Sequence, residues 1–119
     1  MVDYEFSLPM PPSVNGYWRT FRNRQIISKK GREYKKSVLC VMQDLNLCNE
    51  GIAEQLSVSI TLHHFQDRKF DIDNYCKCLF DAIGEAGFWL DDSQIFKMAV
   101  EKGEKVKGGR VDIKINILS

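Results

Sequence analysis

Two short acidic segments are the part of this sequence whose residue types and spacing could do chemistry. The first, KFDIDNYCK over residues 69–77, holds Asp71, Asp73 and, four positions later, Lys77. The second, GFWLDDSQ over residues 87–94, holds Asp91 and Asp92. Carboxylates that lie close together repel one another unless a cation compensates them, and hard oxygen ligands suit Mg²⁺ or Mn²⁺. The two segments therefore indicate metal-dependent phosphoryl chemistry, in which a nearby lysine stabilises charge on the phosphate.

The spacing of these residues predicts how they could meet. Side chains two positions apart in an extended segment share a face, so Asp71 and Asp73 are expected to point together, with Lys77 one helical turn after Asp73. If residues 88–90 enter the core, the chain folds back and brings one aspartate of the second segment to the first. Spacing alone leaves open which of those two aspartates it is. A plainer interpretation also stays open, in which Asp73 only caps a helix and pairs with Lys77 at the surface.

Other kinds of site are not supported by the sequence. The acidic loop lacks the glycine and the terminal glutamate of an EF-hand, and VKGGR lacks the ending of a phosphate-binding Walker loop. No serine or cysteine triad is visible. Adjacent histidines in a strand point to opposite faces, so His63 and His64 are predicted to be partly buried structural residues. The four cysteines are predicted to be free thiols: Cys40, Cys48, Cys76 and Cys78.

Length and composition indicate one globular domain over residues 1–119. Hydrophobic residues make up 44% of the chain and charged residues 28%, as in ordinary soluble domains. No apolar stretch approaches the roughly 18 residues that a membrane span needs, and the start MVDYEFSLP is acidic where a secretory signal would be basic. We therefore expect a cytoplasmic protein that does not act in a membrane.

The charges are segregated along the chain, although the net charge is only +1. Residues 1–36 hold eight basic side chains against three acidic ones, and residues 102–119 hold five against two. Residues 79–101 hold five acidic side chains and one lysine. This distribution is typical of a surface that grips a polyanion around an acidic pocket, although solvated faces would give the same counts.

Hydrophobic periodicity predicts the element order β-α-β-α-β-β. Alternating residues predict strands over 2–8, 56–65 and 111–118, and residues 95–100 are predicted to form a further strand. Helices are predicted over 29–46, capped by Ser28, and from a cap at Asp73 or Asn74 to Ala86, where Gly87 ends the helix. The segment 13–26 is predicted to be a loop. The pattern indicates a single α+β domain with a mixed sheet and helices packed on it.

Three stretches together resemble one known family. LPMPPSVNGYW, DIDNYCKCLFDAIGEAGFWLDDSQI and KGGRVDIKI are similar to the RusA family of Holliday-junction resolvases, over about residues 4–117. The resemblance implies a Mg²⁺-dependent, homodimeric endodeoxyribonuclease, with Mn²⁺ as a substitute, that nicks four-way DNA junctions symmetrically. It also implies that Asp71, Asp73 and Asp92 hold the metal ion and that Lys77 completes the catalytic set.

The expected partner is branched DNA, held by a set of polar and basic residues outside the acidic site: Asn15, Arg19, Arg22, Arg24, Lys29, Lys30, Arg68, Lys69, Lys105, Lys107 and Arg110. Phe70 is expected either to be buried in a strand or to stack on a base at the branch point. Two alternatives to the nuclease are a junction-binding protein without catalysis and a metal-dependent phosphatase or nucleotide hydrolase.

Overall fold

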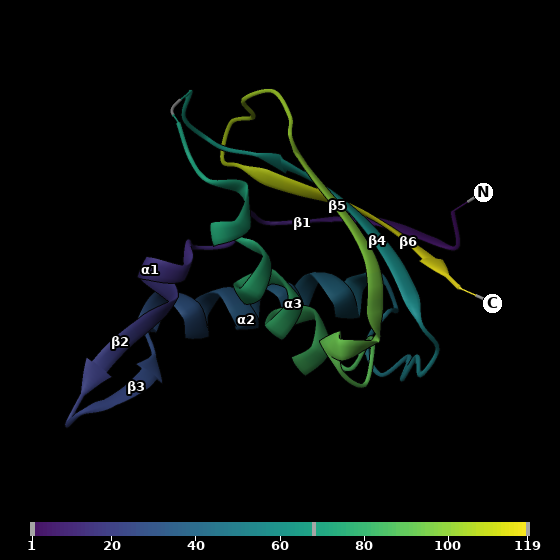
Figure 1. Ribbon diagram of the computed structural model, residues 1–119, viewed down its shortest axis with the longest axis horizontal. Coiled ribbons are helices and arrows are strands. Elements are labelled where there is room, and N and C mark those ends of the chain that lie inside the picture. Colours follow the sequence, from purple (N-terminus) through teal and green to yellow (C-terminus); the bar gives the residue numbers. More distant parts are fainter. Residues whose placement is uncertain (1, 68, 119) are drawn as a thin grey trace.

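A four-stranded mixed sheet with two helices on one face forms the body of the protein (Figure 1). The structure is a computed structural model and describes residues 2–67 and 69–118. The sheet has the order β1 (Tyr4–Leu8), β6 (Arg110–Ile117), β4 (Leu56–His63), β5 (Ile95–Lys102). Strands β4 and β5 are parallel and the other neighbours are antiparallel. This confirms the predicted α+β class, and each predicted strand lies within two residues of its expected ends.

One face of the sheet is apolar because the strands alternate. The inward positions of β4 and β6 are fully buried, and they include Ile60 of β4 and Ile113 of β6, which lie opposite each other in the register. Helices α2 (Lys29–Asp44) and α3 (Cys76–Glu85) cover this face (Figure 1). Two parallel strands cannot be joined by a tight turn, so β4 and β5 need a long crossover, and α3 supplies it. Both acidic segments lie on this crossover.

Helix α2 begins as predicted. The Ser28 side chain accepts a hydrogen bond from the Gly31 backbone N–H at 3.1 Å, which satisfies one of the free donors of the first turn. Its apolar face is buried at Tyr34, Val38 and Met42. The helix ends at Asp44 rather than at the predicted residue 46, and Leu45, which lies beyond it, is exposed.

Helix α3 starts later than the sequence predicted. A short 3₁₀ turn, η1 (Ile72–Asn74), comes first, and α3 follows Tyr75 without a side-chain cap. The prediction that Asp73 or Asn74 caps this helix was therefore wrong. The predicted stop is confirmed, since Gly87 has a φ of +85°, which favours glycine.

The segment predicted as a loop over 13–26 contains a separate structure. It forms a short helix, α1 (Val14–Tyr17), and an antiparallel hairpin of β2 (Trp18–Phe21) and β3 (Arg24–Ile27). The hairpin turns at Arg22 and Asn23, which both have positive φ angles of 53° and 59°, as a two-residue type I′ turn requires. We call β2 and β3 with this turn the arm, because it projects from the body of the protein (Figure 1).

Three other expectations can be compared with the structure. All four cysteines are free thiols, and His63 and His64 are both buried, as predicted. His63 lies between the Glu104 carbonyl oxygen, 2.8 Å from its Nδ1, and a carboxylate oxygen of Asp112, 3.0 Å from its Nε2. Within residues 2–67 and 69–118, no helix is long and apolar enough to cross a bilayer.

Candidate active site

Helix α3 and the turn that precedes β5 meet at Lys77. The Lys77 ammonium lies 3.1 Å from Asp81 Oδ1 and 3.9 Å from Asp92 Oδ2. Asp92 is the first residue of η2 (Asp92–Gln94), a 3₁₀ turn at the far end of the crossover. The crossover therefore brings an aspartate of the second acidic segment to the lysine of the first.

Two buried aromatic residues explain why the chain folds back here. Phe88 and Trp89 lie in the core, where Phe88 makes an edge contact with the Tyr4 ring at 5.1 Å between centroids. The backbone on both sides of Trp89 is bonded to Ile52, whose N–H donates to the Phe88 carbonyl and whose carbonyl accepts from the Leu90 N–H. Leu90 was expected to enter the core with them, but 70% of its surface is exposed. Two apolar residues, rather than three, anchor the return.

The two aspartates of the second segment have different positions, which answers the question that spacing left open. Asp91 precedes η2 and its carboxylate accepts a hydrogen bond from the Ser93 N–H at 3.2 Å. The Gln94 side chain accepts in return from the Asp91 N–H at 2.7 Å, which completes a capping box. Asp91 thus stabilises the turn, and Asp92 is the one that faces Lys77.

The pKa shifts follow from these contacts. Burial raises the pKa of Asp92 above the usual aspartate value, and a hydrogen bond with the Asp91 carboxyl adds to this. The pKa of Asp91 is lowered, chiefly by the Ser93 N–H. The pKa of Lys77 is raised, chiefly by its hydrogen bond to Asp81, with Asp92 and Asp91 contributing through charge. Lys77 is therefore a cation at neutral pH, fixed beside carboxylates.

Asp71 and Asp73 lie at the other acidic segment, just before α3. Both are exposed, and Asp71 is the last extended residue before η1, with φ −89° and ψ 124°. Because residues 72–74 form a 3₁₀ turn, the expectation that both aspartates share one face of an extended segment was based on the wrong local structure. The turn η1 contacts β5 and α3.

The candidate metal ligands, Asp71, Asp73 and Asp92, suit a hard divalent cation because all three are carboxylates. In the part of the chain that the structure describes, however, no three His, Cys, Asp or Glu side chains lie close enough together to hold a metal ion. The structure therefore brings Asp92 to Lys77 but does not gather Asp71 and Asp73 with Asp92 into one ligand cluster.

Asp81 is the site residue that sequence reasoning missed. It holds the Lys77 ammonium more closely than Asp92 does, and it faces the same side of α3. The signal was present, because Asp81 follows Lys77 by four residues, the spacing of ion pairs along a helix. The pair is partly exposed, so its effect on orientation exceeds its effect on stability.

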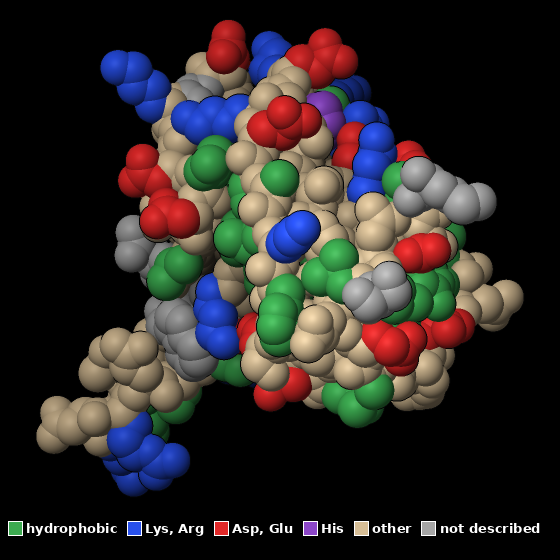
Figure 2. Space-filling view, turned by 45° about the vertical axis from the view of Figure 1, so that its right-hand side comes forward, with side chains coloured by type: hydrophobic (Ala, Val, Ile, Leu, Met, Phe, Trp, Pro, Cys, Tyr) green, Lys and Arg blue, Asp and Glu red, His purple; other side chains and the backbone are tan. Residues whose placement is uncertain are grey.

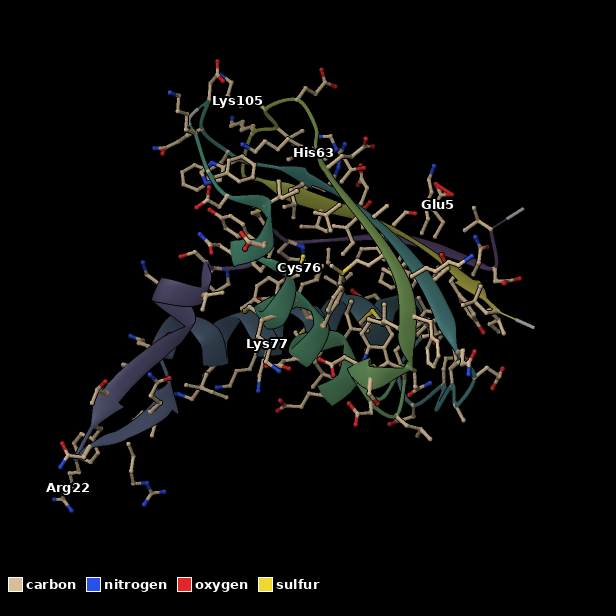
Figure 3. The ribbon with its side chains drawn as sticks, viewed as in Figure 1. Glu5, Arg22, His63, Cys76, Lys77 and Lys105 are labelled. Atoms are coloured by element: carbon tan, nitrogen blue, oxygen red, sulfur yellow. The ribbon has the colours of Figure 1, made fainter. Side chains whose placement is uncertain are left out.

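Basic side chains flank the acidic site on both sides. Figure 3 shows Lys77 on the first turn of α3, between Arg22 at the tip of the arm and Lys105 on the loop after β5. In Figure 2 the projecting arm carries blue basic side chains at its tip and no red acidic ones. The described residues predicted to bind DNA are exposed: Arg19, Arg22, Arg24, Lys29, Lys30, Lys69, Lys105, Lys107 and Arg110. Arg68 and the side chain of Asn15 lie outside the part of the chain that the structure describes.

Phe70 is not in a strand, so its predicted buried strand position was wrong. It lies in the loop between β4 and η1 and is half-buried. Its ring contacts His64 at 5.3 Å and Tyr75 at 5.4 Å between centroids, and the Lys102 ammonium lies 4.5 Å above it. Phe70 is therefore already covered on several sides by the protein itself.

Comparison with known proteins identifies the family. The family model described as "Endodeoxyribonuclease RusA" matches residues 9–117, which include both acidic segments. The chain belongs to the RusA family. This confirms the resemblance seen in the sequence.

Curated RusA-family relatives match over almost their whole length. "Crossover junction endodeoxyribonuclease RusA" of Shigella sonnei (strain Ss046) is 39% identical over 115 residues, which is 97% of this chain and 95% of the relative. The protein of the same name from Escherichia coli (strain K12) is 38% identical with the same coverage. That of Enterobacteria phage HK97 is 39% identical over 118 residues, covering 99% of this chain and 98% of the relative. Phage relatives agree with a prophage or phage setting for this RusA-family chain.

Proposed function

We propose that this RusA-family chain is a structure-specific endodeoxyribonuclease. It cuts four-way DNA junctions by paired symmetric nicks, in the cytoplasm, during DNA recombination and repair. The observation that carries the proposal is the approach of Asp92 to Lys77 across the β4–β5 crossover, which joins the two acidic segments around one fixed cation. The names of the relatives support a junction as the substrate.

We assign the metal ligands to three aspartates. Asp71, Asp73 and Asp92 would hold Mg²⁺, for which Mn²⁺ would substitute. When bound, the ion supplies a Lewis acid that polarises the scissile phosphodiester and lowers the pKa of a water molecule. A dication would also compensate the negative charge of several carboxylates in one site.

The other side chains act by position and charge. Lys77 is protonated at neutral pH, and its ammonium would stabilise the negative charge that builds up on the phosphate oxygens. Asp81 restricts where that ammonium can go. Asp91 is a positioning residue, since its capping box fixes the turn that presents Asp92. The expected products are 5′-phosphate and 3′-hydroxyl ends.

A homodimer is part of the proposal. One acidic site per chain cannot cut two strands at symmetric points, whereas a twofold dimer has the symmetry of the junction. The basic residues flanking the site would hold the DNA arms through phosphate contacts, which give affinity without reading the sequence.

A cleavage assay on synthetic junctions tests the proposal. With Mg²⁺, we expect the unmutated protein to nick four-way junctions, Asp92→Asn to be inactive, and Asp91→Asn to keep much of its activity, because the aspartate at 91 only stabilises the turn. EDTA should stop cleavage. Junction binding without nicking by the unmutated protein would instead support a non-catalytic binding protein, and faster turnover of nucleotides than of junctions would support a nucleotide hydrolase.

A further inference from the structure

A pocket of about 490 Å³ opens beside the candidate active site. Most of its walls come from the segment 10–13 after β1, from helix α2, and from His64, Phe65 and Tyr75 between β4 and α3. Gly16 of α1 and Gly108 of the loop before β6 complete the lining. This volume lies within the range of roughly 300–1,000 Å³ that is usual for small-molecule sites. None of the catalytic assignments above uses this pocket.

A row of aromatic rings ends in the pocket. The Phe70 ring stacks on His64 at 5.3 Å, and His64 stacks on Phe65 at 4.5 Å with an interplanar angle of 21°. His64 is held in place because its Nδ1 accepts a hydrogen bond from the Gln66 N–H at 3.0 Å. Phe65 is the last ring of the row, and 51% of its surface is exposed. An exposed flat ring on a fixed stack is a platform on which one more flat ring can lie.

The opposite wall of the pocket supplies hydrogen-bonding groups. Helix α2 contributes the Glu33 carboxylate, the Lys30 ammonium and the Ser37 hydroxyl. Glu33 makes a long ion pair with the exposed Lys29, at 3.9 Å, so its carboxylate can also accept from another donor. A carboxylate accepts from the amino groups of bases, and an ammonium donates to their ring nitrogens and carbonyl oxygens. The pocket therefore combines an aromatic platform with acceptors and donors for the edge of a ring.

The pocket is next to the acidic site along the chain. Tyr75 lines the pocket, directly follows η1 and precedes the α3 turn that carries Lys77. A nucleotide whose base lies in the pocket would keep its phosphates near η1. Bases at a branch point are the least well stacked of a junction, so extruding one there costs least.

From this arrangement we propose that the pocket binds one unpaired nucleobase extruded from the branch point, stacked on Phe65 and hydrogen-bonded by the α2 side chains. This inference rests on the proposed function and deepens it. It assigns Phe65 as a residue that positions the junction, distinct from the residues assigned to metal binding and catalysis.

The test combines a protein variant with a DNA variant. Junctions with a single abasic nucleotide at each position around the branch point are compared with the intact junction, using the unmutated protein and Phe65→Leu. Phe96→Leu is the matched control, because Phe96 is also an exposed phenylalanine, 62% exposed, on the edge strand β5. Dissociation constants are measured in Ca²⁺, and nicking is measured in Mg²⁺.

We expect Phe65→Leu to weaken binding of the intact junction by between about fivefold and about 150-fold, the range of one base–aromatic stack. One abasic position should weaken binding by the unmutated protein similarly, and at that position Phe65→Leu should cause no further loss. Binding by Phe65→Leu equal to that of Phe96→Leu would overturn the inference, as would losses that multiply at every abasic position. In both cases normal nicking by the unmutated protein would leave the proposed function standing. If the unmutated protein neither binds nor nicks junctions, the proposed function fails and the pocket inference fails with it.

Discussion

Replacing Phe88 by alanine tests whether a buried aromatic anchor holds the turn that presents Asp92. Phe88 is fully buried and makes edge contacts with the rings of Tyr4 at 5.1 Å and Phe6 at 5.6 Å. Truncating a fully buried phenylalanine costs about 3–5 kcal/mol, since the lost contacts leave a cavity. A domain of this length has a total unfolding free energy of about 6–18 kcal/mol. We therefore expect Phe88→Ala to fold but to lose a large part of its stability, with a Tm lower by about 10–25 °C.

The measurement is urea unfolding followed by tryptophan fluorescence and by circular dichroism, with thermal unfolding as a second probe. Phe96→Ala is the matched control, because Phe96 is 62% exposed and its truncation should change the unfolding free energy by no more than about 0.5 kcal/mol. A loss below about 1 kcal/mol for Phe88→Ala, or a loss equal to that of the control, would refute the reasoning that this residue anchors the return of the chain.

Three further predictions concern the helix, the acidic site and the thiols. Gly84→Ala should lower the free energy of unfolding, measured in urea, by about 1–2 kcal/mol. The new Cβ would lie 3.0 Å from Nε1 of Trp89, which is fully buried and cannot move aside, and this clash outweighs the better helix propensity of alanine. A variant more stable than the unmutated protein would contradict this. In the metal-free protein, burial raises the pKa of Asp92, so this carboxylate should take up its proton at a pH above the ordinary aspartate range, as measured by NMR titration in EDTA; titration at or below that range would contradict the burial of this carboxylate. Burial raises the pKa of Cys78 to about 12, so its thiol is protonated and unreactive at pH 8. Iodoacetamide at pH 8 should therefore modify the exposed Cys40 and leave Cys78 unmodified in the folded protein, as measured by mass spectrometry. Alkylation of Cys78 without unfolding would contradict this.

The elements with strong periodicity could be predicted from the sequence. Strands β1, β4 and β6 alternate clearly, and helix α2 has both a cap at Ser28 and a regular apolar stripe, so each signal agreed with the final packing. The arm could not be predicted in the same way. Its turn is formed by Arg22 and Asn23 and contains no glycine, so the usual sequence signal of a two-residue hairpin is missing.

The candidate site was predictable only in part. The spacing indicated that the second acidic segment folds back to the first if apolar residues between them enter the core. Phe88 and Trp89 are buried in this way. The sequence also contains a signal that distinguishes Asp91 from Asp92. Asp91 and Gln94 have the spacing of a capping box, which assigns Asp91 to the turn and leaves Asp92 to face Lys77. The start of α3 was not predictable from capping residues, since the helix begins without a side-chain cap.

In the described part of the chain, the arm forms a two-stranded sheet of its own, in which β2 pairs with β3 and with no strand of the main sheet. Its length can therefore change by pairs of residues without shifting the register of any strand beneath α2 and α3 or moving the turn that carries Asp92. The length of the arm and the geometry of the acidic site can therefore change independently of each other. The hairpin could be lengthened, shortened or exchanged to fit a different DNA geometry without altering the candidate active site.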